Sequence, residues 1–393
     1  MSKSKRILMF LENNTYPQDS RVRHEAKSLT DAGYQVTIIC PKKHGQAWRA
    51  QVKQVNVYRY SAPLDAQGFV GYLVEYGYSL MAAFLLSLLV FVREGFDIIH
   101  THNPPDLFVL IAGFYKLLGK KFIFDQHDLS PELYFARFKV GGNRLTYQAL
   151  LFFEWLSYRV ADHVIATNGS YKNIQMQRGK IPEERITIVR NGPDLQEMSF
   201  TADHQVAHKG STAILYVGDM GFHDGIEYLL QSIQHLKNEF GRTDFKCTLV
   251  GTGDAEESLK ALSESLQITE FLSFTGWINH NEVSKYLQAA DICVAPEPAN
   301  NYNSRSTAIK IMEYMAGEKP IVAYDLPEHR VTAGDAAIYA KPNDELDFAR
   351  HIASLMDNRD LRERLGHIGK ERIESKLAWK HQQKYLLNAY MNL

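Results

Sequence analysis

Cysteine is scarce in this chain of 393 residues, and its three copies, Cys40, Cys247 and Cys293, lie far apart. Each follows or ends an apolar run, which is typical of a small buried side chain. This spacing excludes a disulfide framework and a cysteine-rich metal site. We therefore expect a reducing, cytoplasmic setting for the protein.

The sequence also lacks a strong charge imbalance and a long apolar run. Its formal net charge is -1, so the composition does not point to a nucleic-acid-binding protein. The apolar residues before Glu12 are too few for a signal-peptide core, and we expect a strand there. The longest apolar run, 80–92, falls short of the roughly 20 residues that cross a bilayer, so it predicts a buried helix.

A repeated alternation of strand and helix patterns is present instead. An apolar strand pattern at 6–11 precedes an amphipathic helix pattern at 21–33 and a second strand pattern at 35–40. The same alternation returns in the second half, at 211–218, 225–238, 246–251, 271–276, 292–296 and 319–324. Such alternation predicts an α/β fold with parallel sheets that helices cover on both faces.

Two such series predict two Rossmann-like domains. We expect a first domain over 1–192, a second over 205–375, and a C-terminal helix over 376–393 that packs back on the first. The predicted join is the polar stretch 191–211, which lacks periodicity. Ligands of open parallel sheets bind beyond the carboxyl ends of the strands, so site residues should follow strands in both domains.

One predicted helix carries charge within a mostly apolar pattern. Ser306, Lys310 and Glu313 lie within about 60° of one another around the helix that ends at Gly317, and Ser304 or Ser306 is its predicted N-cap. A helix N-terminus with an ammonium nearby suits a phosphate, and a carboxylate can accept two hydrogen bonds from a ribose. A simple surface ion pair between Lys310 and Glu313 is the open alternative.

The segment KIMEYMAGEKPIVA, residues 310–323, resembles the donor-site helix of the family 4 retaining glycosyltransferases, which have the GT-B fold. Other segments resemble the family in the expected order: YPQDSRVRHEAKSLTDAGYQVTIICP, FDIIHTHNPPD, FIFDQHDLSPE, IVRNGPD, ILYVGDMGFHDGIEYLL, TLVGTGD, FTGWI and AADICVAP. The resemblance covers nearly the whole chain. It implies two Rossmann-like domains with parallel sheets facing a central cleft, and a nucleotide sugar held mainly by the second domain.

The resemblance also implies roles for single residues. Glu313 matches the glutamate that binds the ribose hydroxyls, and His127 matches the catalytic histidine that reaches the donor sugar; Lys310 is the second catalytic candidate. The strand-end positions implied in donor binding are Gly218, Asp219, Gly251, Gly276, Trp277 and Ile278. Glycines after strands can also be simple turns, and a histidine at a strand end can be structural.

Two positions depart from the family pattern. The first glutamate of a pair common in the family is replaced by Arg305, which leaves the contacts to the sugar hydroxyls or the diphosphate open among Asn303, Arg305 and Thr307. Ser306 is a further donor-binding candidate. A lysine that many members carry before a glycine is replaced by Asp224, and the candidates to supply its charge are Lys310 and, more weakly, Arg190.

On the acceptor side, the candidates are Asp19, Arg21, His102 and Asp128. His100 and His102, with Asp125 and His127, could imitate a metal site. We expect no metal and no cofactor, because no second motif has metal-ligand spacing and no aspartate-x-aspartate pair is present.

The segment 134–160 interleaves Arg137, Lys139, Arg144 and Arg159 with aromatic residues. Two interpretations stay open: a core helix with a basic rim, or a patch for peripheral contact with the inner face of a membrane. The second would suit a lipid-linked sugar as acceptor.

The resulting hypothesis is a metal-independent, retaining transfer of a hexosyl group from a nucleoside-diphosphate sugar, with a uridine donor favoured, to a sugar or lipid-linked sugar. Such transfers assemble surface polysaccharides and other glycans. One alternative is a nucleotide-sugar 2-epimerase that uses Asp125, Asp128 and Glu132 for proton removal. The other is a catalytically inactive protein that binds sugar nucleotides.

Overall fold

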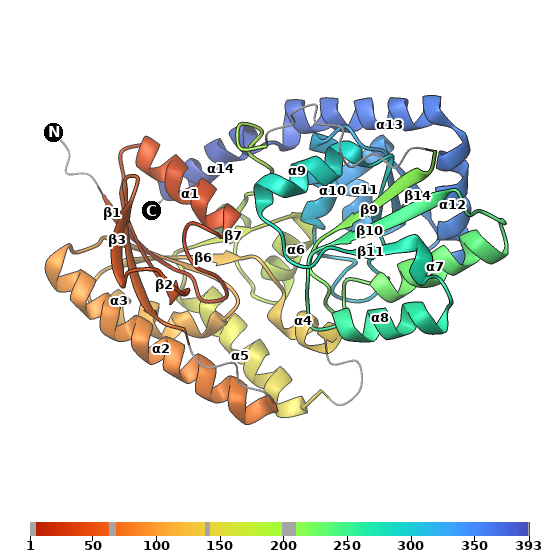
Figure 1. Cartoon of the computed structure of the whole chain (residues 1–393). Helices are drawn as coiled ribbons and strands as arrows, with labels where there is room; N and C mark the ends of the chain where they lie inside the picture. The colour runs from red at the N-terminus through yellow and green to blue at the C-terminus, as the bar shows by residue number, and fades with distance from the viewer. Residues whose placement is uncertain (1–4, 63–67, 138–141, 199–209, 392) are drawn as a thin grey trace. The chain divides into compact units, whose positions relative to one another are not determined.

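The computed structural model describes residues 5–62, 68–137, 142–198, 210–391 and 393 (Figure 1). The chain divides into two compact units. The first comprises Met1–Phe135, Val140–Asn191 and Gln382–Leu393, and the second comprises Ala136–Lys139 and Gly192–His381. Lys139, named in the basic and aromatic segment, lies outside the described residues.

The first unit is built on an eight-stranded sheet with the order β3-β4-β2-β1-β5-β6-β7-β8. Its strands are β1 Arg6–Phe10, β2 Gln35–Lys42, β3 Arg49–Val52, β4 Val55–Ser61, β5 Ile98–His102, β6 Lys121–Gln126, β7 His163–Ala166 and β8 Ile186–Ile188. Neighbouring strands are parallel except β3 and β4, which form an antiparallel pair at one edge. The carboxyl ends of β1, β5 and β6 therefore meet at the same end of the sheet.

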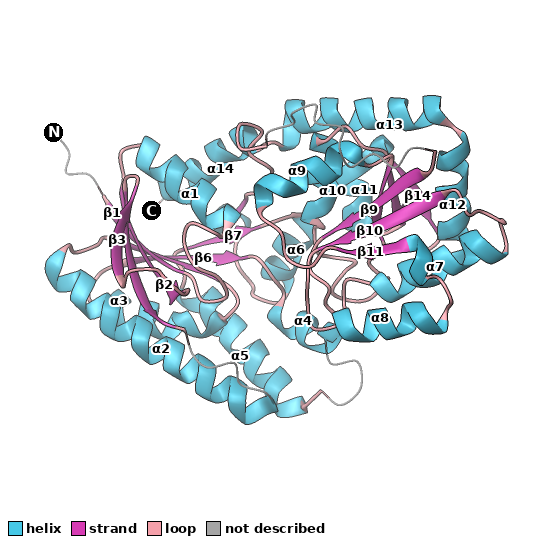
Figure 2. Cartoon of the chain, in the orientation of Figure 1, coloured by secondary structure: helices cyan, strands magenta, loops and turns pink. Residues whose placement is uncertain are grey.

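Helices cover both faces of this sheet, as Figure 2 shows. They are α1 Ser20–Asp31, α2 Gly68–Arg93, α3 Val109–Lys116, α4 Ser130–Arg137, α5 Arg144–Val160 and α6 Gly169–Gln177. The chain turns back between β2 and β5, so right-handed crossovers place α1 on one face and α2, α3 and α5 on the other (Figure 1). The last turns of α14, Trp379–Met391, also belong to this unit, where the Tyr390 hydroxyl lies 2.6 Å from His100 Nδ1.

The apolar run 80–92 lies in α2, and the prediction of a buried helix was wrong for one of its faces. Ala83, Ser87 and Val90 are buried, whereas Met81 and Leu85 are exposed. By length and composition alone, the part of α2 over 74–93 would suffice to cross a membrane, with a mean hydropathy of 1.7. The helix instead packs its buried face on β2 and β4.

The second unit contains a six-stranded parallel sheet with the order β11-β10-β9-β12-β13-β14. The strands are β9 Thr212–Val217, β10 Phe245–Val250, β11 Leu272–Phe274, β12 Ile292–Ala295, β13 Ile321–Tyr324 and β14 Ala337–Ala340. The helices are α7 Ile226–Asn238, α8 Glu256–Ser265, α9 His280–Ala289, α10 Ile309–Ala316, α11 Pro327–Ala333, α12 Glu345–Asp357 and α13 Arg359–Arg372. The predicted alternation of strands and helices is thus confirmed.

The core of the second unit lies on both faces of its sheet. Because side chains alternate along a strand, Ile214 and Tyr216 of β9 join one buried cluster, which α7, α8 and α12 complete. Leu215 and Val217 point to the other face and join the cluster that α10 completes. Burial on both faces explains why the strand patterns are almost continuously apolar.

Candidate active site

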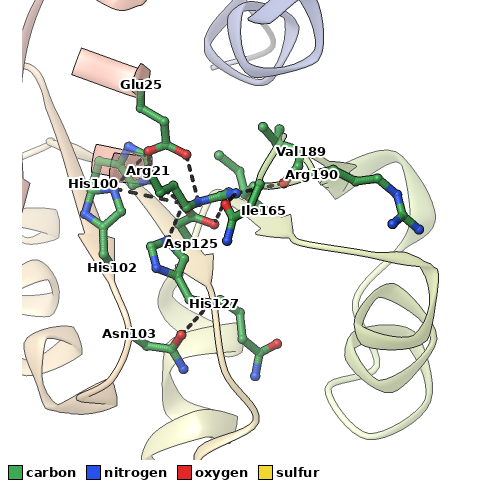
Figure 3. Close-up of polar contacts among 12 residues, drawn as sticks. Arg21, Glu25, His100, His102, Asn103, Asp125, His127, Ile165, Val189 and Arg190 are labelled. Atoms are coloured by element: carbon green, nitrogen blue, oxygen red, sulfur yellow. Dashed lines mark hydrogen bonds and ion pairs between the residues drawn. The ribbon is translucent and has the colours of Figure 1, made fainter. Parts of the chain in front are cut away.

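Charged side chains gather at the carboxyl end of the first sheet (Figure 3). His100 and His102 lie on the same face of β5 because they are two positions apart, and their rings stack with centroids 4.2 Å apart. Arg21 and Glu25 lie on the same side of α1 because they are four positions apart, and Asp125 comes from β6. All five residues are buried, and we call them the Arg21 cluster.

Arg21 holds the two carboxylates of the cluster. Its Nε and Nη2 atoms each donate to Asp125 over 2.9 Å, and its Nε also lies 3.0 Å from Glu25 Oε1. Its Nη1 donates to the Val189 carbonyl over 2.9 Å and to Asn191 Oδ1. Burial alone would raise the pKa of Asp125, but Arg21 and then His127 hold that pKa well below its ordinary value.

The two histidines of the cluster differ in charge. His102 Nδ1 lies 3.0 Å from the Phe10 carbonyl and its Nε2 lies 2.9 Å from Glu25 Oε2, so both ring nitrogens face acceptors and both must donate. Burial opposes this charge, but the hydrogen bond to Glu25 and the nearby carboxylates raise the pKa of His102. Burial and the neighbouring His102 lower the pKa of His100, which is therefore neutral.

Charge balance bears on the metal site that these residues could form. The ligand atoms of Glu25, His100, His102 and Asp125 all lie within 4.8 Å of one another. Both carboxylates, however, are already compensated by Arg21 and by the His102 imidazolium. A divalent cation would have to displace the buried Arg21 guanidinium, so the residues present fit a charge-balanced hydrogen-bond network better than a metal centre.

The Arg21 cluster fixes His127, the predicted catalytic histidine. Its Nε2 lies 2.9 Å from Asp125 Oδ2, and its backbone amide donates to Asn103 Oδ1 over 2.6 Å. Because the neighbour of Nε2 is a carboxylate, the proton of a neutral ring is placed on Nε2. Nδ1 is then a hydrogen-bond acceptor, and the His127 side chain is 14% exposed.

The predicted acceptor-side residues have different surroundings. Asp19 caps α1, since its side chain accepts a hydrogen bond from the Val22 amide over 2.8 Å. Arg21 and His102 are buried, so they can influence a ligand through Asp125 and His127 but cannot contact one directly. Asp128 is half-buried, and its carbonyl accepts from Asn103 Nδ2 over 2.8 Å.

Glycines occupy the strand ends of the second unit, as the donor-site prediction requires. The Gly218 amide donates to the Val250 carbonyl over 3.0 Å, and the Gly251 amide donates to the Gly276 carbonyl over 3.3 Å. A Cβ atom on Gly251, whose φ is +132°, would lie 1.9 Å from Gly218 O. The glycines implied in donor binding therefore lie side by side, with Trp277 72% exposed and Ile278 packed against the core.

The helix with the charged pair begins later than predicted. Its first residue is Ile309 and its N-cap is Ala308, which makes no side-chain cap bond, so the prediction of a cap by Ser304 or Ser306 was wrong. The preceding residues form turns, in which the Ser306 amide donates to the Tyr302 carbonyl over 3.0 Å. Lys310 therefore lies in the first turn of α10, and Glu313 is half-buried one turn further on.

Lys310 has two carboxylate partners that the sequence analysis missed. Its Nζ lies 2.6 Å from Glu297 Oε1 and 3.4 Å from Asp224 Oδ1, and it donates to the Tyr216 hydroxyl over 2.9 Å. Burial opposes the charge of Lys310, but Glu297, Tyr216 and Asp224 raise its pKa well above its ordinary value. The position of Glu297, two residues beyond β12, is the signal that could have identified it.

The remaining donor-site candidates lie around the turn before α10. Asn303 is buried, and its amide group donates to the carbonyls of His223 and Pro298 over 2.9 and 3.0 Å. Arg305 Nη1 donates to the Asn301 carbonyl over 3.1 Å. Asn303 thus supports the turn, while Arg305, Ser306 and Thr307 are half-buried. Asp219 is exposed, and burial of part of its carboxylate and the charge of Asp224 raise its pKa.

Both halves of the chain match models of known protein families. Residues 19–197 match the family model described as Glycosyltransferase Family 4, and residues 200–372 match the model described as Glycosyl transferases group 1. The chain belongs to the family 4 glycosyltransferases. The predicted family resemblance is thereby confirmed for both halves of this glycosyltransferase.

Named relatives are distant. The chain is 23% identical, over 60% of its length, to an uncharacterised glycosyltransferase of Methanocaldococcus jannaschii, of which it spans 62%. It is 22% identical, over 49% of its length, to the glycogen synthase of Mycobacterium tuberculosis, of which it spans 45%. The chain thus spans less than two thirds of each of these relatives.

Solved structures share the fold over the whole chain. Sucrose-phosphate synthase from Thermosynechococcus elongatus has a TM-score of 0.81, with 18% identity over 98% of each chain. Anabaena HepE in complex with UDP and glucose has a TM-score of 0.75, with 14% identity over 98% of this chain and 99% of HepE. The predicted GT-B fold is confirmed.

Replacing Arg21 by Met should destabilise the protein strongly, because it removes the guanidinium that pairs with the buried Asp125 carboxylate. We expect a loss of about 3–5 kcal/mol and a fall of about 10 °C in the melting temperature measured by calorimetry. Lys27→Met is the matched control, since Lys27 lies on the same helix in an exposed pair with Asp31 over 3.5 Å. Equal melting temperatures for the two variants would contradict the account.

The raised pKa of Asp106 predicts how the stability of the protein depends on pH. This buried residue accepts from Asn103 Nδ2 over 3.0 Å, and burial, followed by the charge of Glu154, raises its pKa from 3.8 to about 7. The folded protein therefore holds this proton more tightly than the unfolded chain does. Its stabilising effect is complete below the unfolded pKa and is lost as the pH rises through about 7.

Comparison with Asp106→Asn isolates this effect. Between about pH 5 and pH 8, the wild-type protein should lose about 2 kcal/mol of unfolding free energy relative to the variant, as measured by denaturant titration. A difference that stays constant with pH would show that Asp106 is ionised in the folded state.

Proposed function

We propose that this glycosyltransferase transfers a hexosyl group from a nucleoside-diphosphate sugar, with UDP as the favoured nucleotide, to a hydroxyl group of a sugar or lipid-linked sugar. The transfer is proposed to retain the anomeric configuration and to need no metal. The proposal rests on three glycines that follow strands of the second unit, Gly218, Gly251 and Gly276, of which each contacts the next. Gly218 also lies beside the Lys310 side chain in the first turn of α10.

The second unit is proposed to bind the donor. The amino end of α10 and the glycine backbone suit a diphosphate, and Glu313 suits the two ribose hydroxyls. Lys310 adds a fixed ammonium, but Glu297 and Asp224 offset its charge, so we assign the larger share of phosphate binding to the backbone amides. The UDP bound in the Anabaena HepE structure supports the choice of nucleotide.

The proposed mechanism uses fixed dipoles and the Lys310 ammonium in place of a metal ion. As the bond between the anomeric carbon and the diphosphate breaks, negative charge grows on the leaving phosphate oxygens, and the helix amides with Lys310 stabilise it. In the first unit, His127 Nδ1 offers an acceptor for a sugar hydroxyl. Its orientation is set by Asp125, so no reorganisation is needed during the reaction.

The two alternatives receive less support from the site. Of the carboxylates proposed for an epimerase, Asp125 is a weak base because its pKa is held low, and Glu132 pairs with Arg178 over 2.7 Å. An epimerase would also convert its substrate without an acceptor, and an inactive binding protein would give no product at all. A product assay with and without added acceptor separates the three functions.

Glu313→Gln tests the donor assignment. UDP-glucose should raise the melting temperature of the wild-type protein more than GDP-mannose does, because a ligand that binds the folded state stabilises it. We expect about tenfold weaker UDP-glucose binding by Glu313→Gln, since two hydrogen bonds to a charged acceptor are weakened. The matched control is Glu257→Gln, whose side chain is 90% exposed on α8.

The same measurement can contradict the proposal in two ways. If no nucleotide sugar raises the melting temperature, the donor class is wrong. If Glu313→Gln binds UDP-glucose as tightly as the control does, the donor lies elsewhere in the protein. The anomeric configuration of the product, read by NMR, decides between retention and inversion.

A further inference from the structure

The outer surfaces of α2, α3 and α5 carry an unusual number of exposed apolar side chains. On α2, the exposed residues Val74, Tyr78, Met81, Leu85 and Val92 follow one another at intervals of three, four or seven positions and so form one stripe along the helix. On α3 and the turn that follows it the exposed residues are Leu110, Phe114, Leu117 and Leu118, and on α5 they are Leu145, Phe152 and Trp155. We call these three stripes the apolar face.

The stripes belong to neighbouring helices. The Phe84 ring of α2 meets the Phe114 ring of α3 with centroids 5.3 Å apart, and the Ser87 and Tyr115 hydroxyls lie 2.9 Å apart. Helix α3 in turn packs on α5. All three helices cover the same face of the first sheet, which Figure 1 shows as the orange and yellow helices. The apolar face is therefore much larger than the scattered exposed residues of an ordinary surface.

The exposed charges on the described residues of α2, α3 and α5 have one sign. Arg93, Arg144 and Arg159 are exposed on these helices. Among the described residues of α2, α3 and α5, no acidic side chain is exposed, since Glu75 is half-buried and Glu154 is buried. Apolar side chains with only basic exposed charges match a surface whose hydrocarbon is covered by anionic head groups.

We propose that the apolar face binds the surface of a bilayer that contains anionic phospholipids, with α2, α3 and α5 lying on the membrane. This inference does not depend on the proposed function. It extends the predicted patch in 134–160, which contributes α5, by two further helices. Lipid is favoured over a second copy of the chain, because two identical faces in contact would bring the same arginines toward one another.

The helices are proposed to lie on the bilayer and not to cross it. Ala83, Ser87 and Val90 form the buried face of α2, which packs on the sheet, and Ser87 is bonded to Tyr115 of α3. Insertion of α2 across a membrane would pull this face out of the core. Contact through the exposed stripe keeps the fold unchanged.

Vesicle flotation tests the proposal with the full chain. The wild-type protein should float with vesicles of equimolar phosphatidylcholine and phosphatidylglycerol, less with phosphatidylcholine alone, and less as sodium chloride is added. The double variant Met81→Glu/Leu85→Glu should bind about tenfold more weakly, because it places two charges in the stripe. The matched control is Val331→Glu, at an exposed apolar position on α11 of the second unit.

A second set of variants tests the charges. The triple change Arg93→Gln, Arg144→Gln and Arg159→Gln should reduce binding to the anionic vesicles by about fivefold per arginine and leave the weak binding to phosphatidylcholine unchanged. Circular dichroism and the melting temperature check that each variant is folded. We expect every variant to fold, because all of the substituted residues are exposed.

Three results would overturn the proposal. The wild-type protein could fail to float with anionic vesicles even at low salt, or the Met81→Glu/Leu85→Glu variant could float as well as Val331→Glu. The third result is self-association in analytical ultracentrifugation that the double variant abolishes, without any binding to vesicles. That result would assign the apolar face to a second copy of the chain.

Discussion

The buried pairing of Arg21 with Asp125 is the constraint on which the first half of the candidate site depends. Two ions taken out of water each lose hydration worth several kcal/mol, so neither tolerates removal of the other. Next to this pair, Glu25 and the His102 imidazolium form a second ion pair, so the four side chains together carry no net charge. Arg21 also donates to the Val189 carbonyl, close to the point where the chain leaves the first unit. The pair thereby ties α1, β5 and β6 to one geometry, and His127 inherits that geometry through Asp125.

The second unit contains a similar arrangement of one cation and two carboxylates. Lys310, whose side chain is 10% exposed, is the cation, and Glu297 and Asp224 are its two carboxylates, so this group carries a net negative charge when all three are ionised. Asp224 stands at a position where many members of the family carry a lysine. Its carboxylate contacts Lys310, the residue expected to supply the missing positive charge. The departure in sequence and the position of Lys310 are therefore two parts of one ion-pair arrangement. Phosphate binding by this unit must depend more on backbone amides than the sequence suggested.

Local periodicity accounts for what could be predicted from the sequence. Strands and helices repeat at 2.0 and 3.6 residues, so the alternation that defines both sheets, and the glycines at strand ends, are visible along the chain. Contacts between distant segments are not periodic. Arg21 and Asp125 are 104 positions apart, and nothing near Lys310 identifies Glu297 as its partner. The run 80–92 is apolar on all sides of α2, so hydrophobicity does not show which side the sheet covers. For this reason the sequence predicts burial of the whole run.

The central claim is that the Arg21 cluster presents His127 to a ligand with its proton on Nε2 and an acceptor at Nδ1. The most direct test is the ¹⁵N NMR spectrum of the His127 ring in the full-length protein, at a pH where the ring is neutral. The account predicts one dominant tautomer, with a protonated Nε2 and a bare Nδ1. A proton on Nδ1, or an even mixture of the two tautomers, would contradict it.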